Sequence, residues 1–151
     1  MPKMVIADTS CLIIFDKIKE FEILKGVYRE IYTTPEVLSE FGKSLPVWIK
    51  IISVKDKKYQ KFVETLLDKC ESSVLALAIE QNDSILIVDD IKARKFGKQI
   101  DINFTGTLGV INKAKELKLI DQIKPVIDKL KETNFRISNR VIDNLLKMNN
   151  E

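Results

Sequence analysis

Two continuous apolar runs stand out along the chain, and each ends at an acidic residue. Met4–Ala7 is followed by Asp8, and the run over 84–88 is followed by Asp89 and Asp90. A strand that is apolar throughout is typical of a parallel sheet covered on both faces, because neither of its sides meets water. The pattern therefore predicts two buried parallel strands with carboxylates at their ends.

Shorter strands and several helices are predicted between and after these two runs. The pattern predicts strands at 30–33, 51–54 and 103–105, a helix that begins at Thr34 and Pro35, two helices within 61–81, a basic helix over 92–98 and mostly helices from Gly106 onward. Strands that alternate with helices favour a three-layer α/β/α sandwich with a mostly parallel central sheet of four or five strands.

The composition is that of one domain. The chain has 151 residues, 45% of them hydrophobic, and its 5 glycines and 4 prolines form no linker or repeat. We expect 1–151 to be a single domain. Apolar residues recur at helical spacing over 121–151, which predicts a C-terminal helical extension that packs on the domain or on a second subunit.

The residue types present narrow the chemistry and the compartment. The chain has no histidine, so serine–histidine triads and histidine-held metals are excluded. Its two cysteines are too few for a disulfide framework. No run approaches the roughly 18 apolar residues that span a bilayer, and the first residues lack a secretory signal, so we expect a cytoplasmic protein without membrane contact. The net charge of +3 does not identify a partner.

Four carboxylates are predicted to meet at one edge of the sheet. Asp8 and Asp89 follow the two apolar strands, whose carboxyl ends share an edge. Glu40 lies one turn into the helix after the second strand, and Glu71 starts the helix before the run over 84–88. Like charges this close repel one another unless a cation or shared protons compensate them. Oxygen ligands without imidazole favour Mg²⁺ or Mn²⁺.

Each of these acids also has a simpler explanation. Asp8 and Asp89 fit equally well as helix caps or solvated strand ends, and Asp90 is an alternative to Asp89 as a ligand. Glu40 fits a polar helix face, and Glu71 is favoured at a helix start whether or not it binds metal. The basic segment around Arg94 either contacts phosphate or is a solvated face.

Five short stretches, taken in order, resemble the PIN-domain family, in particular its VapC-like toxins. They are Val5-Ile6-Ala7-Asp8-Thr9-Ser10, Pro35-Glu36-Val37-Leu38-Ser39-Glu40, Cys70-Glu71-Ser72-Ser73-Val74-Leu75-Ala76-Leu77-Ala78, Ile85-Leu86-Ile87-Val88-Asp89-Asp90 with Ala93-Arg94, and Thr105-Gly106-Thr107-Leu108-Gly109-Val110. Cys70 and Ser73 stand where the most similar subgroup usually has a glycine and a second glutamate.

The resemblance implies a PIN-like fold and a metal-dependent endoribonuclease that cleaves RNA. Carried over, the catalytic acids around Mg²⁺ or Mn²⁺ are Asp8, Glu40, Glu71 and Asp89, with Asp90 as a further metal ligand. Ser10, Arg94 and Thr105 are the implied substrate-binding residues. The resemblance also implies a homodimer and a small antitoxin protein as partners.

Two other functions are compatible with the same residues. A PIN-like domain whose acidic pocket no longer cuts would act as a nucleic-acid or protein binding module. A receiver-like phosphoacceptor domain also gathers aspartates, a threonine and a lysine at strand ends around Mg²⁺. In this chain the Asp-Asp pair follows a late strand rather than the first, so the receiver-like function ranks last.

Overall fold

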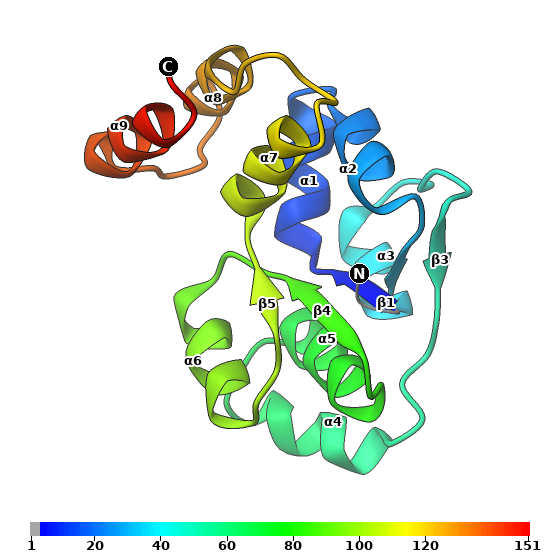
Figure 1. Ribbon diagram of the computed structural model, residues 1–151. Helices are drawn as coiled ribbons and strands as arrows, with labels where there is room; N and C mark the ends of the chain where they lie inside the picture. Colours follow the sequence, from blue (N-terminus) through cyan, green and yellow to red (C-terminus); the bar gives the residue numbers. More distant parts are fainter. Residues whose placement is uncertain (1–3) are drawn as a thin grey trace.

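The computed structural model describes residues 4–151 and centres on a parallel sheet (Figure 1). The strands of these residues are β1 (Met4–Ala7), β2 (Ile31–Thr33), β3 (Ile49–Ile51), β4 (Ser84–Ile87) and β5 (Phe104–Thr105). They lie in the order β3-β2-β1-β4-β5, and every neighbouring pair is parallel. The predicted sheet is confirmed, with five strands.

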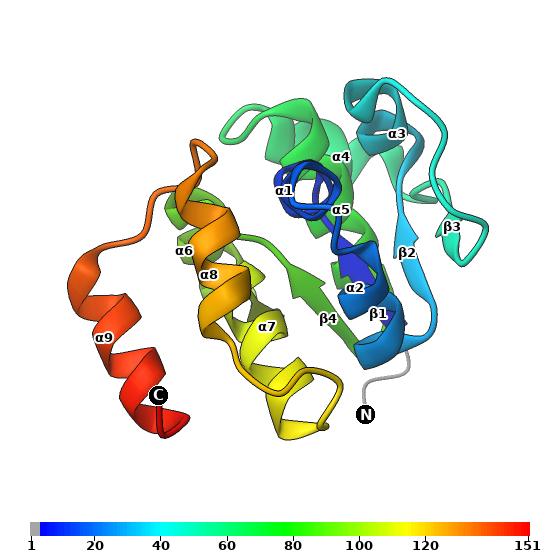
Figure 2. The ribbon, with the colours of Figure 1, turned by 90° about the horizontal axis from the view of Figure 1, so that it is seen from above.

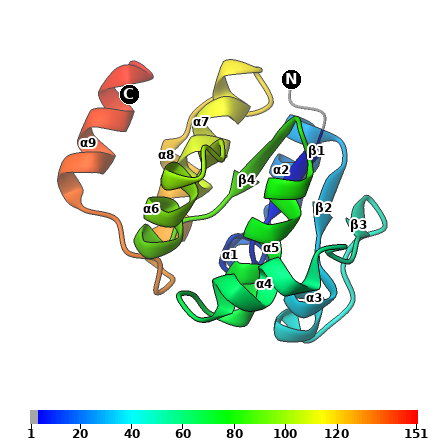
Figure 3. The same ribbon diagram turned by 90° about the horizontal axis from the view of Figure 1, so that it is seen from below.

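Helices cover both faces of this sheet. Those of residues 4–151 are α1 (Thr9–Lys17), α2 (Phe21–Tyr28), α3 (Pro35–Phe41), α4 (Lys57–Glu64), α5 (Lys69–Glu80), α6 (Ile91–Gln99), α7 (Thr107–Glu116), α8 (Lys124–Lys131) and α9 (Asn139–Met148). Figures 2 and 3 show α1, α2 and α7 on one face and α4, α5 and α6 on the other. Helix α3 contacts both α1 and α5. This arrangement is the predicted three-layer α/β/α sandwich.

The two apolar runs form the centre of the sheet. Strands β1 and β4 pair over their whole length, from Met4 against Ser84 to Ala7 against Ile87. The backbone N–H of Asp8 continues the ladder and donates to the carbonyl of Ile87 at 3.1 Å. Because the strands run in the same direction, the residues that follow both of them emerge at one edge of the sheet.

The strand order reverses direction at this edge, between β1 and β4. From β1 the sheet continues through β2 on one side and β4 on the other, and a ligand in such an open sheet binds beyond the carboxyl ends at this switch point. Receiver-like domains use the strand order 2-1-3-4-5, in which β1 lies between β2 and β3. Here β2 lies between β1 and β3. The receiver-like alternative is therefore wrong.

Most element boundaries match the sequence pattern, with two shifts. Helix α4 begins at Lys57, four residues before the predicted stretch, because Asp56 caps it by accepting from the N–H of Tyr59. The strand predicted at 51–54 lies at Ile49–Ile51, because the ladder with β2 begins with the N–H of Ile31 donating to Trp48 and ends with Ile52 donating to Thr33. Thr34 caps α3 as predicted, by accepting from the N–H of Val37.

The C-terminal residues form α8 and α9, which lie beside α7 (Figure 1). Val126, Ile127 and Leu130 of α8 and Ile142 of α9 belong to the buried hydrophobic core. Beyond α9, Glu151 forms an ion pair with Lys115 of α7. None of the helices in residues 4–151 is long and apolar enough to cross a membrane.

Candidate active site

Asp8 is a buried acid at the carboxyl end of β1. It is 3% exposed, and its side chain caps α1 by accepting from the N–H of Thr9 at 2.8 Å. The pKa of Asp8 is raised to about 7, chiefly by burial, with smaller contributions from the charges of Asp68, Glu40 and Asp90 and against the lowering effect of the Thr9 hydrogen bond. Asp8 therefore caps α1, as the simpler explanation had it, and it also lies near three other acids whose charges oppose its ionisation.

Glu71 is the second acid whose ionisation is opposed by its surroundings. Asp68 caps α5 by accepting from the N–H of Glu71 at 2.8 Å, which fixes both residues at the start of this helix. Burial raises the pKa of Glu71 to about 8, with contributions from the charges of Asp68, Asp90 and Asp8. Glu71 and Asp8 therefore share the same two acidic neighbours.

These electrostatic interactions define one group of acids, which we call the acidic cluster. It consists of Asp8, Glu40, Asp68, Glu71 and Asp90. Glu40 is exposed on α3, and Asp90 caps α6 by accepting from the N–H of Ala93 at 2.9 Å. Sequence reasoning missed Asp68. Its position three residues before Glu71 was the available signal, since that is the spacing of a helix cap.

The side chain of Asp89 has different partners from that of Asp90. Its two carboxylate oxygens accept from the backbone N–H of Thr107 at 2.9 Å and from the Thr107 hydroxyl at 2.6 Å. The Arg94 guanidinium lies 4.0 Å away. Asp89 thus ties the end of β4 to the start of α7. It is Asp90, its neighbour in the sequence, whose charge acts on Asp8 and Glu71.

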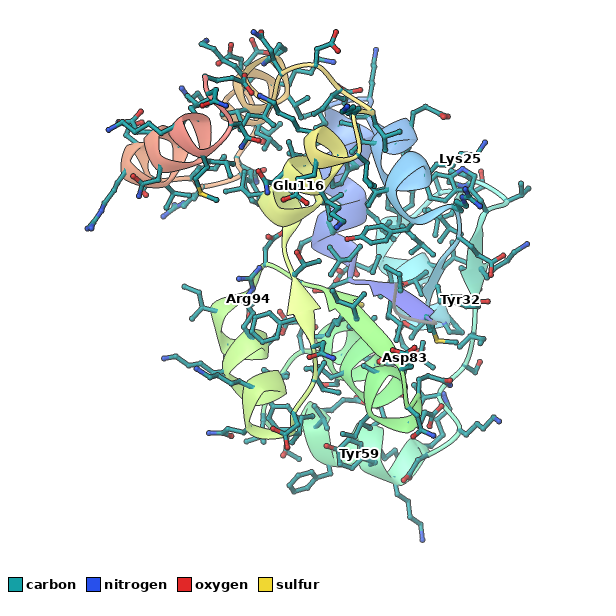
Figure 4. All side chains as sticks on the ribbon, viewed as in Figure 1. Lys25, Tyr32, Tyr59, Asp83, Arg94 and Glu116 are labelled. Atoms are coloured by element: carbon teal, nitrogen blue, oxygen red, sulfur yellow. The ribbon has the colours of Figure 1, made fainter. Side chains whose placement is uncertain are left out.

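Arg94 is held at the junction of α6, β4 and β5 (Figure 4). Its Nε donates to the carbonyl of Val88 at 2.8 Å, and its guanidinium lies over the Phe104 ring, 5.2 Å from the centroid. Gly106 makes room for this arrangement, because a Cβ there would overlap with the guanidinium of Arg94 and with Asp89. Arg94 lines a cavity of about 660 Å³ next to these strand ends.

The two hydroxyl residues predicted to bind substrate occupy different surroundings. Ser10 is exposed on the first turn of α1, two residues after Asp8. Thr105 is half-buried at the end of β5 and lines the same cavity as Arg94. A Cβ on Gly109 would overlap with the Thr105 hydroxyl, so a glycine at 109 leaves this hydroxyl its space.

The chemistry of the acidic cluster fits a hard divalent cation. Within residues 4–151, no three acidic or cysteine side chains are placed so that they would hold one metal ion together. All the donors are carboxylate oxygens, which are the ligands that Mg²⁺ and Mn²⁺ prefer. Burial is the main cause of the raised pKa values of Asp8 and Glu71, and the charges of neighbouring acids add to it. A bound cation favours the ionised form of both carboxyls.

The residues that depart from the resembling pattern have structural partners. Cys70 is buried and donates its thiol to the carbonyl of Glu36 at 3.4 Å, and burial raises its pKa to about 11. The Ser73 hydroxyl lies 2.7 Å from the carbonyl of Cys70 and 2.6 Å from the hydroxyl of Thr34. Both side chains therefore join α5 to α3, the helix that carries Glu40.

Comparison with known proteins identifies the family. A family model described as a PIN domain matches residues 4–151. The chain therefore belongs to the PIN-domain family, whose members are generally nucleases and typically use divalent metal ions. The comparison with curated proteins found no match.

Proposed function

We propose that the protein is a metal-dependent endoribonuclease that hydrolyses RNA phosphodiester bonds at the acidic cluster. The observation that carries this proposal is that buried Asp8 and half-buried Glu71 have the same acidic neighbours, Asp68 and Asp90, whose charges oppose the ionisation of both. Burying Asp8 and half-burying Glu71 next to other acids costs stability, and groups with such shifted pKa values are concentrated at functional sites.

Asp8, Glu40, Glu71 and Asp90 would hold Mg²⁺ or Mn²⁺, with Asp68 beside them and Asp89 positioning the adjoining chain. When bound, the ion lowers the pKa of a water molecule and neutralises charge on the phosphodiester. The raised pKa values of Asp8 and Glu71 mean that their carboxylates retain protons near neutral pH until a cation displaces them. Arg94, Ser10 and Thr105 would bind the RNA.

We further propose that the nuclease is the toxin of a toxin–antitoxin pair. This rests on the resemblance of the five stretches to VapC-like toxins. The expected partners are an RNA substrate, a small antitoxin protein and a second copy of the chain. Light scattering of the purified protein measures its oligomeric state, and co-expression with the product of the neighbouring reading frame tests for an antitoxin.

The decisive experiment measures cleavage of structured and single-stranded RNA with Mg²⁺, with Mn²⁺ and with a chelator. We expect cleavage by the wild-type protein that stops when the metal is chelated and is abolished in Asp8→Asn. Asp121→Asn is the matched control, since Asp121 is exposed on the link between α7 and α8. Metal-dependent cleavage by Asp8→Asn at the wild-type rate would contradict the assignment.

One observation favours a second function, a binding module without catalysis. In the part of the chain that the structure describes, no three acids are placed to hold one ion, and Asp89 is engaged by Thr107 and Arg94. A catalytically inactive PIN domain would bind RNA or a protein through the same edge. Binding of RNA with no metal-dependent cleavage of any RNA tested would identify this function.

A further inference from the structure

A cavity opens between the sheet edge and the C-terminal helices. It measures about 660 Å³, which lies within the size range of small-molecule sites. One wall comes from α6 and β5 and carries Arg94, Phe104 and Thr105, and the opposite wall comes from the link between α8 and α9 and carries Phe135 and Arg136. Figures 1 and 3 show α9 on the side of α7 that faces α6.

The two walls present the same pair of side-chain types. Each offers an arginine and a phenylalanine, Arg94 with Phe104 and Arg136 with Phe135. Among the described residues, Arg94 donates a hydrogen bond only from its Nε, and one outer nitrogen lies 4.0 Å from Asp89. The outer nitrogens therefore keep hydrogen-bond donors for a ligand. Arg136 is exposed. Guanidinium groups grip phosphate, and aromatic faces stack on bases.

The cavity lies next to a member of the acidic cluster in the sequence and shares lining residues with a second hollow. Asp89 lines it and directly precedes Asp90, a member of the cluster. The second hollow, of about 410 Å³, shares Phe135 and Arg136 and adds Lys131. The basic and aromatic lining therefore extends over two adjoining hollows, which suits a chain of linked nucleotides better than a single small ligand.

We infer that this cavity is a subsite for a nucleotide of single-stranded RNA adjoining the scissile phosphodiester, with Arg136 and Phe135 of the α8–α9 link as its specific contacts. This inference rests on the proposed function. Arg94 and Arg136 bind the phosphate, and a base stacks on Phe135 or Phe104. The C-terminal helices thus supply part of the substrate site and not only part of the core.

The test measures the affinity of variants for a short fluorescein-labelled single-stranded RNA, by fluorescence anisotropy in chelator over a series of salt concentrations. Arg136→Gln is expected to weaken binding and to lower the slope of log affinity against log salt by about 0.7, the loss of one phosphate contact to a single strand. Phe135→Leu keeps the apolar contact but removes stacking, so binding weakens about fivefold or more with an unchanged salt slope.

Arg140→Gln is the matched control. Arg140 is exposed on the first turn of α9 and lines neither hollow, so its loss removes the same charge four residues away. We expect it to bind RNA nearly as the wild-type protein does. Equal losses in Arg136→Gln and Arg140→Gln, or no loss in Phe135→Leu, would overturn the subsite. Melting temperatures establish that each variant is folded.

The binding assay is independent of cleavage, so the two proposals fail separately. If the variants change RNA affinity as expected but the protein cleaves no RNA, the nuclease proposal is wrong and the subsite stands. If the protein cleaves RNA with metal but the variants do not change RNA affinity as expected, the nuclease stands and the subsite is wrong. Displacement of the RNA by polyglutamate as effectively as by unlabelled RNA would mean that the cavity takes an acidic protein, and no RNA binding by the wild type would also overturn the subsite.

Discussion

At the scale of single residues, Asp8 shows most directly how the site affects the fold. Its pKa of about 7 in the folded protein exceeds the ordinary value near 3.9. The folded state therefore binds more protons than the unfolded state between these values, and the free energy of unfolding falls as pH rises through this range. Asp8 alone accounts for up to about 4 kcal/mol of this fall. Glu71, whose pKa is raised to about 8, acts in the same direction.

Urea unfolding in chelator at pH 5 and pH 8 measures this effect. The wild-type protein is expected to be less stable at pH 8, and Asp8→Asn is expected to lose much of the difference because an amide does not ionise. Exposed Asp121→Asn serves as the control and keeps the wild-type behaviour. An undiminished pH dependence in Asp8→Asn would show that its carboxyl is not the group responsible.

The neighbours Asp89 and Asp90 are predicted to differ in their response to a cation. Asn caps a helix as well as Asp, so Asp90→Asn keeps α6 intact while removing a charge from the acidic cluster. We expect it to reduce the rise in melting temperature that Mg²⁺ or Mn²⁺ produces. Asp89→Asn weakens the contacts with Thr107, lowers stability without metal by roughly 1–2 kcal/mol and keeps the rise. The opposite pattern would identify Asp89 as the ligand.

At the scale of elements, two glycines next to the site differ in the space around them, so a side chain fits at one and not at the other. A Cβ on Gly97, within α6, would meet Leu75 Cδ2 at 3.5 Å, which is an ordinary contact, so Gly97→Ala is expected to stabilise the helix by about 0.5–1 kcal/mol. A Cβ on Gly106 would lie 2.6 Å from an Asp89 oxygen and would overlap with Arg94. Gly106→Ala is therefore expected to cost roughly 1–3 kcal/mol. Urea unfolding measures both, and equal effects would contradict the argument.

The elements that could be predicted from the sequence are those whose signal is local. Strands β1 and β4 are continuous apolar runs, and Thr34 with Pro35 indicates the start of α3. The position of β3 depends on its pairing with β2, a contact between segments that no local pattern contains. The different partners of Asp89 and Asp90 likewise depend on where α7 begins relative to β4. The sequence pattern missed Asp68 because an aspartate at a helix cap looks like an ordinary helix start, whether or not it also lies near other acids.

At the scale of the whole molecule, charge is separated although the net charge is only +3. The acidic cluster lies after β1 and β4, on α3 and at the start of α5. Arg94, Arg136 and Lys131 line the two hollows. An anionic strand is repelled by the first region and attracted by the second. Binding of RNA through basic hollows would hold a phosphate close to the acids, where a cation offsets the repulsion.

Glu151 links the C-terminal end of the chain to α7 and to the start of α8. Its side chain, 6% exposed, accepts from Lys115 Nζ at 2.6 Å and from the N–H groups of Ile123 and Lys124 at 2.9 and 3.1 Å. Ile123, the cap residue of α8, provides no side-chain cap of its own, so Glu151 serves this end of the helix. Burial opposes its ionisation, but the hydrogen bonds from Lys115, Ile123 and Lys124 outweigh burial and lower the pKa of Glu151.

Glu151→Gln removes the charge that pairs with Lys115 of α7 and that accepts from the N–H groups at the start of α8. We expect faster amide hydrogen exchange in α8 and α9 and unchanged exchange in β1 and β4, because the loss is local. RNA affinity in chelator is also expected to fall, since Phe135 and Arg136 lie on the link between these helices. Asp143→Asn, an exposed charge change on α9, is the control. Faster exchange with unchanged RNA affinity would show that the α8–α9 link contacts no RNA.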